Sequence, residues 1–173
     1  ISGLEIIFTK LHGGGKFSNA TYKVSGGLHG VGASVTNFVS EFLTVIVCRD
    51  NKKFKQTFEF GKKVGSLQEL GHTEEPNGTE VIFKPDPFIF EEAVENEELF
   101  FNKSIIEEKL KLTSYLNKKL EINFKDSRID LEEKYYSEEG ISELVLTKIK
   151  NKEKLMTEKP LTFSFEDVME SKG

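Results

Sequence analysis

Apolar residues recur along the chain at two spacings, and the helical spacing comes first. Residues 2–10 carry an apolar stripe that follows Ser2, with Glu5 three positions on, which predicts a short helix opened by a capping box. A second stripe predicts a helix from about residue 29 or 30 to residue 42. Its expected buried face consists of Val31, Val35, Phe38, Val39 and Phe42.

The pattern then changes to the two-residue alternation that is typical of strands. Strands are predicted in succession over residues 43–48, 54–60, 66–70 and 79–84. In the first of them, Leu43, Val45 and Val47 point to one face and Thr44, Ile46 and Cys48 to the other. This pattern indicates that both faces are buried. Asp50-Asn51-Lys52 and Pro76-Asn77-Gly78 are rich in turn-forming residues and separate the strands.

The remainder of the chain alternates between the two spacings. A helix capped by Ser104 is predicted to run to Leu116, with Ile105, Ile106, Leu110 and Leu112 buried. The further elements expected are a strand at 120–124, a turn at 126–130, a strand with Tyr135 and Tyr136, a helix at 138–150 and a strand at 161–165. Consecutive strands flanked by helices predict an α+β fold, a two-layer sandwich whose mostly antiparallel sheet is covered by helices.

Composition narrows the function classes. The 173 residues carry a formal net charge of −5, which argues against a surface that grips a DNA backbone, because phosphate contacts need clustered Lys and Arg. Cys48 is the single cysteine, so we expect a small buried strand residue and no disulfide. No apolar run approaches membrane-spanning length.

Two glycine-rich segments carry the candidate chemistry, residues 13–16 and residues 26–34. Glycines let backbone amides approach a phosphate closely, and a helix N-terminus adds N–H donors and a partial positive charge. Neither the Walker spacing nor the dinucleotide spacing of glycines is met. Taken alone, these glycines fit a phosphate site or plain turns. Asp126 and Asp130 could pair around a metal ion, but a hairpin turn is the simpler interpretation.

The residues around the glycines resemble a known family. The runs Thr9–Phe17 and Tyr22–Val35 look like the ATP lid of the B subunits of DNA gyrase and topoisomerase IV, which are GHKL ATPases. Weaker similarity continues through residues 77–79, 85–87, 115–118 and 139–141, so it covers essentially the whole chain. The resemblance implies a Bergerat-type GHKL fold, a single partial domain over residues 1–173 that is incomplete at its N-terminus and contains the lid at about residues 10–27.

The resemblance also implies which residues meet ATP. Amides of Leu28, His29, Gly30, Val31 and Gly32 are expected around the β- and γ-phosphates, flanked by Gly27 and Ala33. From the lid, Gly14, Gly15 and Lys16 are expected at the phosphates and Tyr22 at the adenine end. Thr79 matches a threonine that bonds near the adenine.

Catalytic parts of the family precede the lid. These are the glutamate that activates water, the asparagine that holds Mg²⁺ and an adenine-reading aspartate, and none is found in this sequence. We therefore expect no catalytic residue and no metal ligand here. We expect ATP and Mg²⁺ to act in a longer protein, an ATP-dependent type IIA topoisomerase, and the isolated chain to be inactive.

The partners implied by the resemblance are a gyrase A-type or topoisomerase IV A-type subunit, a second B subunit on ATP binding, and DNA held by other domains. A cytoplasmic location and no membrane contact are expected. The runs at residues 22–25 and 116–118 resemble gyrase, whereas residues 9–12 resemble topoisomerase IV, and gyrase is favoured. Two alternatives stay open, another GHKL member of the chaperone or sensor-kinase type, and a non-catalytic interaction domain of the same fold.

Overall fold

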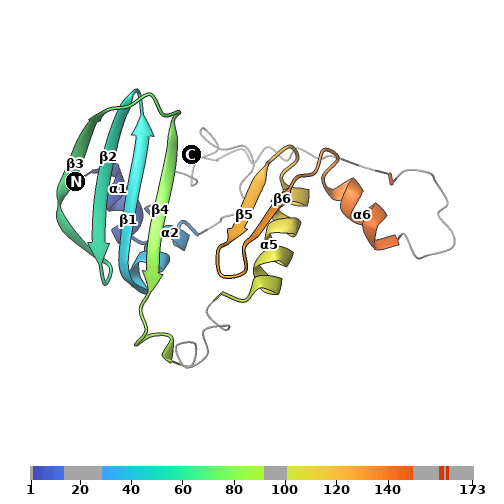
Figure 1. The fold of residues 1–173 in the computed structure, drawn as a ribbon, viewed down its shortest axis with the longest axis horizontal. Coiled ribbons are helices and arrows are strands. Elements are labelled where there is room, and N and C mark those ends of the chain that lie inside the picture. Colours follow the sequence, from blue (N-terminus) through green and yellow to red (C-terminus); the bar gives the residue numbers. More distant parts are fainter. Residues whose placement is uncertain (1, 14–28, 92–100, 150–159, 162, 164–173) are drawn as a thin grey trace, which may run out of the picture. The chain divides into compact units, whose positions relative to one another are not determined.

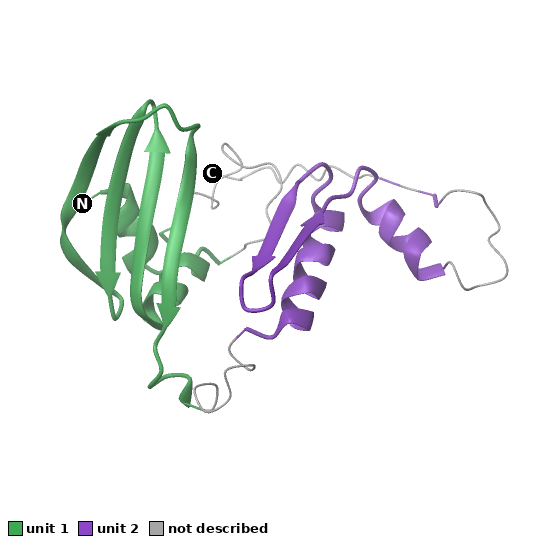
Figure 2. Ribbon diagram, viewed as in Figure 1, with its two compact units in different colours: residues 1–100 green, residues 101–173 purple. Residues whose placement is uncertain are grey.

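The computed structural model describes residues 2–13, 29–91, 101–149, 160, 161 and 163. These residues form two compact units, unit 1 within residues 1–100 and unit 2 within residues 101–173 (Figure 2).

Unit 1 is built on a four-stranded antiparallel sheet with the order β3-β2-β1-β4 (Figure 1). Its strands are β1 (Ser40–Arg49), β2 (Lys52–Glu59), β3 (Lys62–His72) and β4 (Gly78–Pro85). The β1–β2 turn contains Asp50 and Asn51 at φ 53° and 60°, a left-handed conformation that these short polar residues tolerate better than most. The predicted turn at 50–52 is confirmed, and at 76–78 the chain bends at Asn77 before β4 begins at Gly78.

Two helices cover one face of this sheet, α1 (Gly3–Thr9) and α2 (Gly32–Phe38) (Figure 1). The core between sheet and helices consists of Phe8, Leu43, Val45 and Phe58, and the last three are completely buried. Burying an aliphatic or aromatic side chain contributes roughly 1.5–3 kcal/mol to folding, so these few contacts hold the two layers together.

The start of α1 forms as its sequence predicts. The Ser2 hydroxyl accepts a hydrogen bond from the Glu5 amide at 3.1 Å, which caps the helix. The Glu5 carboxylate binds the Lys63 ammonium of β3 at 2.6 Å. One side of the predicted capping box is thus present, while the glutamate links the helix to the sheet.

The second helix differs from its prediction in length and in its buried face. It ends at Phe38, and Phe42 belongs to β1. The buried residues of α2 are polar, Ser34 and Asn37, whereas Val35 and Phe38 are 44% and 39% exposed. Hydrogen bonds to main-chain carbonyls allow the polar residues to be buried, and apolar periodicity carries no signal for this.

The strands depart from prediction mainly at their ends. Strand β3 runs over eleven residues, beyond the predicted 66–70, because it pairs along β2. Phe60 lies outside β2, at φ 46°. Strand β1 is fully buried on the helix-bearing face at Leu43 and Val45. On its other face Cys48 is buried as predicted, but Thr44 and Ile46 are half-buried, so burial of both faces is confirmed only in part.

Unit 2 contains α5 (Lys103–Leu116), a hairpin of β5 (Ile122–Asp126) and β6 (Leu131–Tyr135), and α6 (Ile141–Ile149). Asn102, not Ser104, caps α5, because the Asn102 side chain accepts from the Ile105 amide at 3.1 Å. The expected buried face of α5 was also wrong. Ser114 and Tyr115 are buried, Ile106 and Leu110 are half-buried, and Ile105 and Leu112 are exposed.

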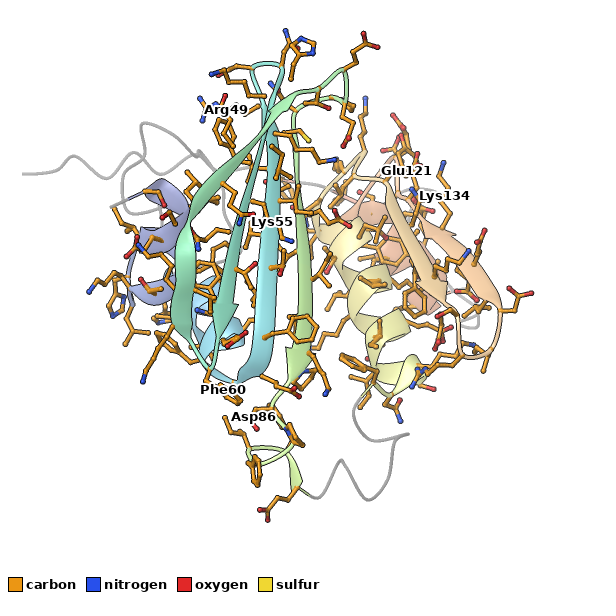
Figure 3. All side chains as sticks on the ribbon, turned by 60° about the vertical axis from the view of Figure 1, so that its left-hand side comes forward. Arg49, Lys55, Phe60, Asp86, Glu121 and Lys134 are labelled. Carbon is orange, nitrogen blue, oxygen red and sulfur yellow. The ribbon has the colours of Figure 1, made fainter. Side chains whose placement is uncertain are left out.

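Ion pairs lie at the hairpin of unit 2. Glu121, which directly precedes β5, has its carboxylate 2.7 Å from the ammonium of Lys134 in β6, and this ammonium holds the pKa of Glu121 below its usual value (Figure 3). The Asp126 carboxylate accepts from the Arg128 side chain at 2.7 Å inside the predicted turn. The turn at 126–130 is confirmed, and the Asp126 carboxylate forms an ion pair with Arg128.

The end of the chain is only partly described. Leu161 and Phe163 are not in a strand, so the final strand is wrong at these two residues, and its other members lie outside the described part. Over the residues that the structure describes, no helix has the length and apolarity needed to cross a membrane.

Candidate functional site

The turn that leads into α2 has an unusual start. Gly30 adopts φ 60°, a left-handed value that glycine accepts without strain. Val31 occupies the N-cap position, where its apolar side chain makes no capping hydrogen bond. The first N–H groups of a helix have no partner within the helix, and a side chain usually supplies one. At α2 the side chain of Val31 accepts no hydrogen bond from these N–H groups.

Among the residues that the structure describes, none fills the space beside Gly32. A Cβ placed on Gly32 meets no atom within 4 Å among the described residues. His29 and Gly32 are both exposed. An oxyanion could therefore approach the main chain here without displacing any of the described side chains, and the helix dipole would favour its charge.

The rest of α2 is fixed to the fold. Ala33 packs against the core of unit 1. The buried Asn37 amide donates to the main-chain oxygen of Phe8 at 2.9 Å and to that of Gly61 at 3.2 Å. These two hydrogen bonds and the packing contact hold α2 against unit 1. The turn that leads into α2 is therefore anchored at its C-terminal end.

Thr79 lies on the same side of the sheet as α2. In β4 it pairs with Val47, which packs against the core beneath the helices. Directly opposed residues of an antiparallel pair point to the same face. The structure thus brings Thr79 and the residues 29–33, expected at opposite ends of one nucleotide, onto one face of one unit.

Sequence reasoning missed two further residues of this face. Val81 and Phe83 pair with Val45 and Leu43 and so continue the row that Thr79 begins. They are 43% and 41% exposed, which leaves an apolar strip beside the polar Thr79. Such a mixture suits a flat heteroaromatic ring. The two-residue alternation from Thr79 was the signal that could have identified them.

His12 makes a contact that sequence could not reveal. Its Nδ1 lies 2.7 Å from the main-chain oxygen of His29, although the two residues are 17 positions apart in the chain. His12 itself adopts φ 61°. This contact joins the end of α1 to the turn that precedes α2.

Half of the residues predicted from the lid resemblance lie outside the described part of the chain. These are Gly14, Gly15, Lys16, Tyr22, Gly27 and Leu28. Their expected contacts with ATP therefore stay predictions. The structure describes the other six. Five of them, His29, Gly30, Val31, Gly32 and Ala33, lie at the start of α2, and Thr79 lies in β4.

Other chemically active groups lie apart from these residues. Burial raises the pKa of the Cys48 thiol, which also donates to Glu75, so the thiol is protonated at neutral pH. Within the described ranges, no three His, Cys, Asp or Glu side chains come together around a possible metal ion. Two hollows of about 410 and 460 Å³ lie in unit 2 and contain none of the expected nucleotide contacts.

The chain is similar to curated B subunits of DNA gyrase and of DNA topoisomerase 4. It is 46% identical over 147 residues to the DNA gyrase B subunit of Borreliella burgdorferi, covering 84% of this chain and 22% of that protein. It is 47% identical over 139 residues to the gyrase B subunit of Thermotoga maritima, with 80% and 21% covered. For the DNA topoisomerase 4 B subunit of Enterococcus faecalis, identity is 45% over 148 residues, with 84% and 21% covered.

The chain thus spans about a fifth of the length of these relatives. No family model matches it. Among solved structures, it resembles the 43K ATPase domain of Thermus thermophilus gyrase B, which was crystallised with an aminocoumarin. The TM-score is 0.68 and the identity 30%, over 91% of this chain and 37% of that one. The GHKL fold expected from the sequence is confirmed.

Proposed function

We propose that this chain, a relative of the B subunits of DNA gyrase and topoisomerase IV over most of its length, is the part of such a protein that binds the phosphates of ATP. The observation that carries the proposal is the shared face of unit 1. It presents the start of α2, where the N-cap residue Val31 makes no capping hydrogen bond and no described atom crowds Gly32, together with Thr79 and an apolar strip. The amides would receive the phosphates, and the strip would receive the base.

The wider activity follows from the relatives. We propose that the intact protein is an ATP-dependent type II topoisomerase, with gyrase favoured, in which ATP binding brings two B subunits together and drives strand passage. An A-type subunit would be the other partner, and DNA would bind through other domains. Mg²⁺ would be held by residues outside this chain. We place the protein in the cytoplasm, treat residues 1–173 as one partial domain and expect the chain alone to have no ATPase activity.

A single methyl group tests the phosphate site. Gly32 is the first residue of α2, and a Cβ there meets no described atom within 4 Å. Gly32→Ala should therefore leave stability unchanged or raise it by up to about 1 kcal/mol, since alanine restricts the unfolded chain. In the intact protein, we expect the same methyl group to crowd the phosphates and weaken ATP binding about tenfold or more. Calorimetric titration with a non-hydrolysable ATP analogue gives the affinity.

Gly3→Ala is the matched control. Gly3 is the first residue of α1, and a Cβ on it also meets nothing within 4 Å. This variant should keep the wild-type affinity. If Gly32→Ala bound the analogue as tightly as Gly3→Ala does, the nucleotide would not approach α2 and the proposal would be wrong.

A further inference from the structure

We propose that His12 is a positioning residue, which orients the main chain of the nucleotide site by holding the carbonyl of His29. The inference rests on the proposed function for its consequence, though not for its geometry. The Nδ1 atom of His12 is 2.7 Å from the His29 oxygen, a short distance for a neutral N–H···O hydrogen bond.

The acceptor fixes the state of the imidazole. A main-chain carbonyl can only accept, so Nδ1 of His12 must carry the hydrogen. This holds for the neutral ring with its hydrogen on Nδ1 and for the charged ring, and it excludes the neutral ring with its hydrogen on Nε2 alone.

The consequence falls on Gly30. The His29 carbonyl and the Gly30 N–H belong to one planar trans peptide group and point in opposite directions. Gly30 adopts φ 60°, and a residue without Cβ permits the preceding peptide to rotate by half a turn at little steric cost. By holding the carbonyl, His12 keeps the Gly30 N–H turned to the other side, as one fixed donor among the amides expected at the phosphates.

His12 is itself held in place. Its neighbour Gly13 donates to the Lys10 oxygen at 3.4 Å, and a Cβ on Gly13 would come within 2.8 Å of the Ile6 oxygen. The chain therefore lies tightly against the end of α1 at this point. Since α1 contributes Phe8 to the core, the position of the imidazole is tied to the body of unit 1.

Two variants separate the hydrogen bond from general packing. Asparagine places an N–H₂ donor at the distance of Nδ1 and tolerates a positive φ, so His12→Asn should bind the ATP analogue within about threefold of wild type. His12→Ala removes the donor and should weaken binding about tenfold, the scale of one net hydrogen bond. Calorimetry on the intact protein measures both affinities, with thermal unfolding recorded beside it.

A spectroscopic measurement on the chain itself tests the geometry without nucleotide. Nitrogen-15 shifts of the His12 ring at pH 8 should show a protonated Nδ1. A ring protonated only on Nε2 would overturn the inference, as would equal affinities for wild type, His12→Asn and His12→Ala. If wild type bound no nucleotide, the proposed function would fail, and the ring shifts would still decide whether His12 holds His29.

Discussion

At the scale of single residues, Asn37 shows how a buried polar group can replace apolar packing. Its side chain is completely buried and donates to main-chain oxygens in α1 and in the β2–β3 turn. The two acceptors, on Phe8 and Gly61, would be left buried without these donors. Asn37, a polar residue outside the predicted apolar stripe, thus links α2 to α1 and to the β2–β3 turn.

We expect Asn37→Ala to destabilise unit 1 by about 2–4 kcal/mol, because two buried carbonyls lose their donors and a small cavity remains. Urea unfolding, followed by circular dichroism, measures the change. Asn117→Ala is the control, since its amide makes a similar bond to the Thr113 oxygen at 2.9 Å but is exposed. Equal losses for the two variants would contradict a special role for burial.

At the scale of elements, the sequence predicted what depends on local chemistry. The Ser2 cap, the turns with Asp50 and Asn77, and the strand β4 follow from residues that are neighbours in the chain. The length of β3 depends on a partner strand, which no local pattern contains. The buried side of α2 depends on carbonyls of Phe8 and Gly61, which are far away in sequence.

In the candidate site, too, some residues could be predicted from local sequence and others depend on distant parts of the chain. The glycine-rich resemblance pointed to His29–Ala33, which the structure places at the start of α2. The alternation from Thr79 put Val81 on the same face, but no local pattern shows that this face carries the helices. The contact of His12 with His29 was missed because it joins two segments through a single imidazole.

The β5–β6 turn offers a pH-dependent prediction. Arg128 donates to the buried Asp126 carboxylate and holds the pKa of Asp126 below its usual value of 3.8. A carboxyl whose pKa is lowered by folding stabilises the fold above its unfolded-state pKa, and this contribution is lost as the pH falls through the folded-state value. Asp126→Asn should therefore lower the Tm by a few degrees at pH 7, and the gap to wild type should shrink below pH 3.

Asp130→Asn is the matched control for this turn. Asp130 is exposed and adopts φ 49°, which asparagine also accepts. Its Tm at pH 7 should equal that of wild type. A gap for Asp126→Asn that stayed constant from pH 7 to pH 2.5 would show that the carboxylate charge has no part in stability.

At the scale of the whole molecule, the two units differ in how much they bury. Unit 1 has Phe8, Leu43, Val45 and Phe58 in one cluster, beneath a strand that is paired on both sides. Among the described residues of unit 2, Tyr115 is the buried large apolar side chain. Apolar burial is the main favourable contribution to folding, so the stability of the two units should be unequal.

Hydrogen exchange followed by mass spectrometry should reveal this inequality. We expect the slowest exchange in β1, at the centre of the sheet, and faster exchange in β5, β6 and α5. The edge strand β3, whose residues 62–70 are all exposed, should exchange faster than β1 within the same unit. Uniform protection across both units would contradict the prediction.

The two hydrogen bonds that the Asn37 side chain donates limit how homologous chains can vary. Both of its acceptors are main-chain oxygens, which every amino acid carries. Position 8 can therefore exchange one large apolar side chain for another without cutting the link to α2. Position 61 has no such freedom, because glycine there adopts φ 76° and a methyl group would collide with the Phe38 ring at 2.7 Å. Natural variation should therefore run among large apolar residues at position 8 and be almost absent at position 61.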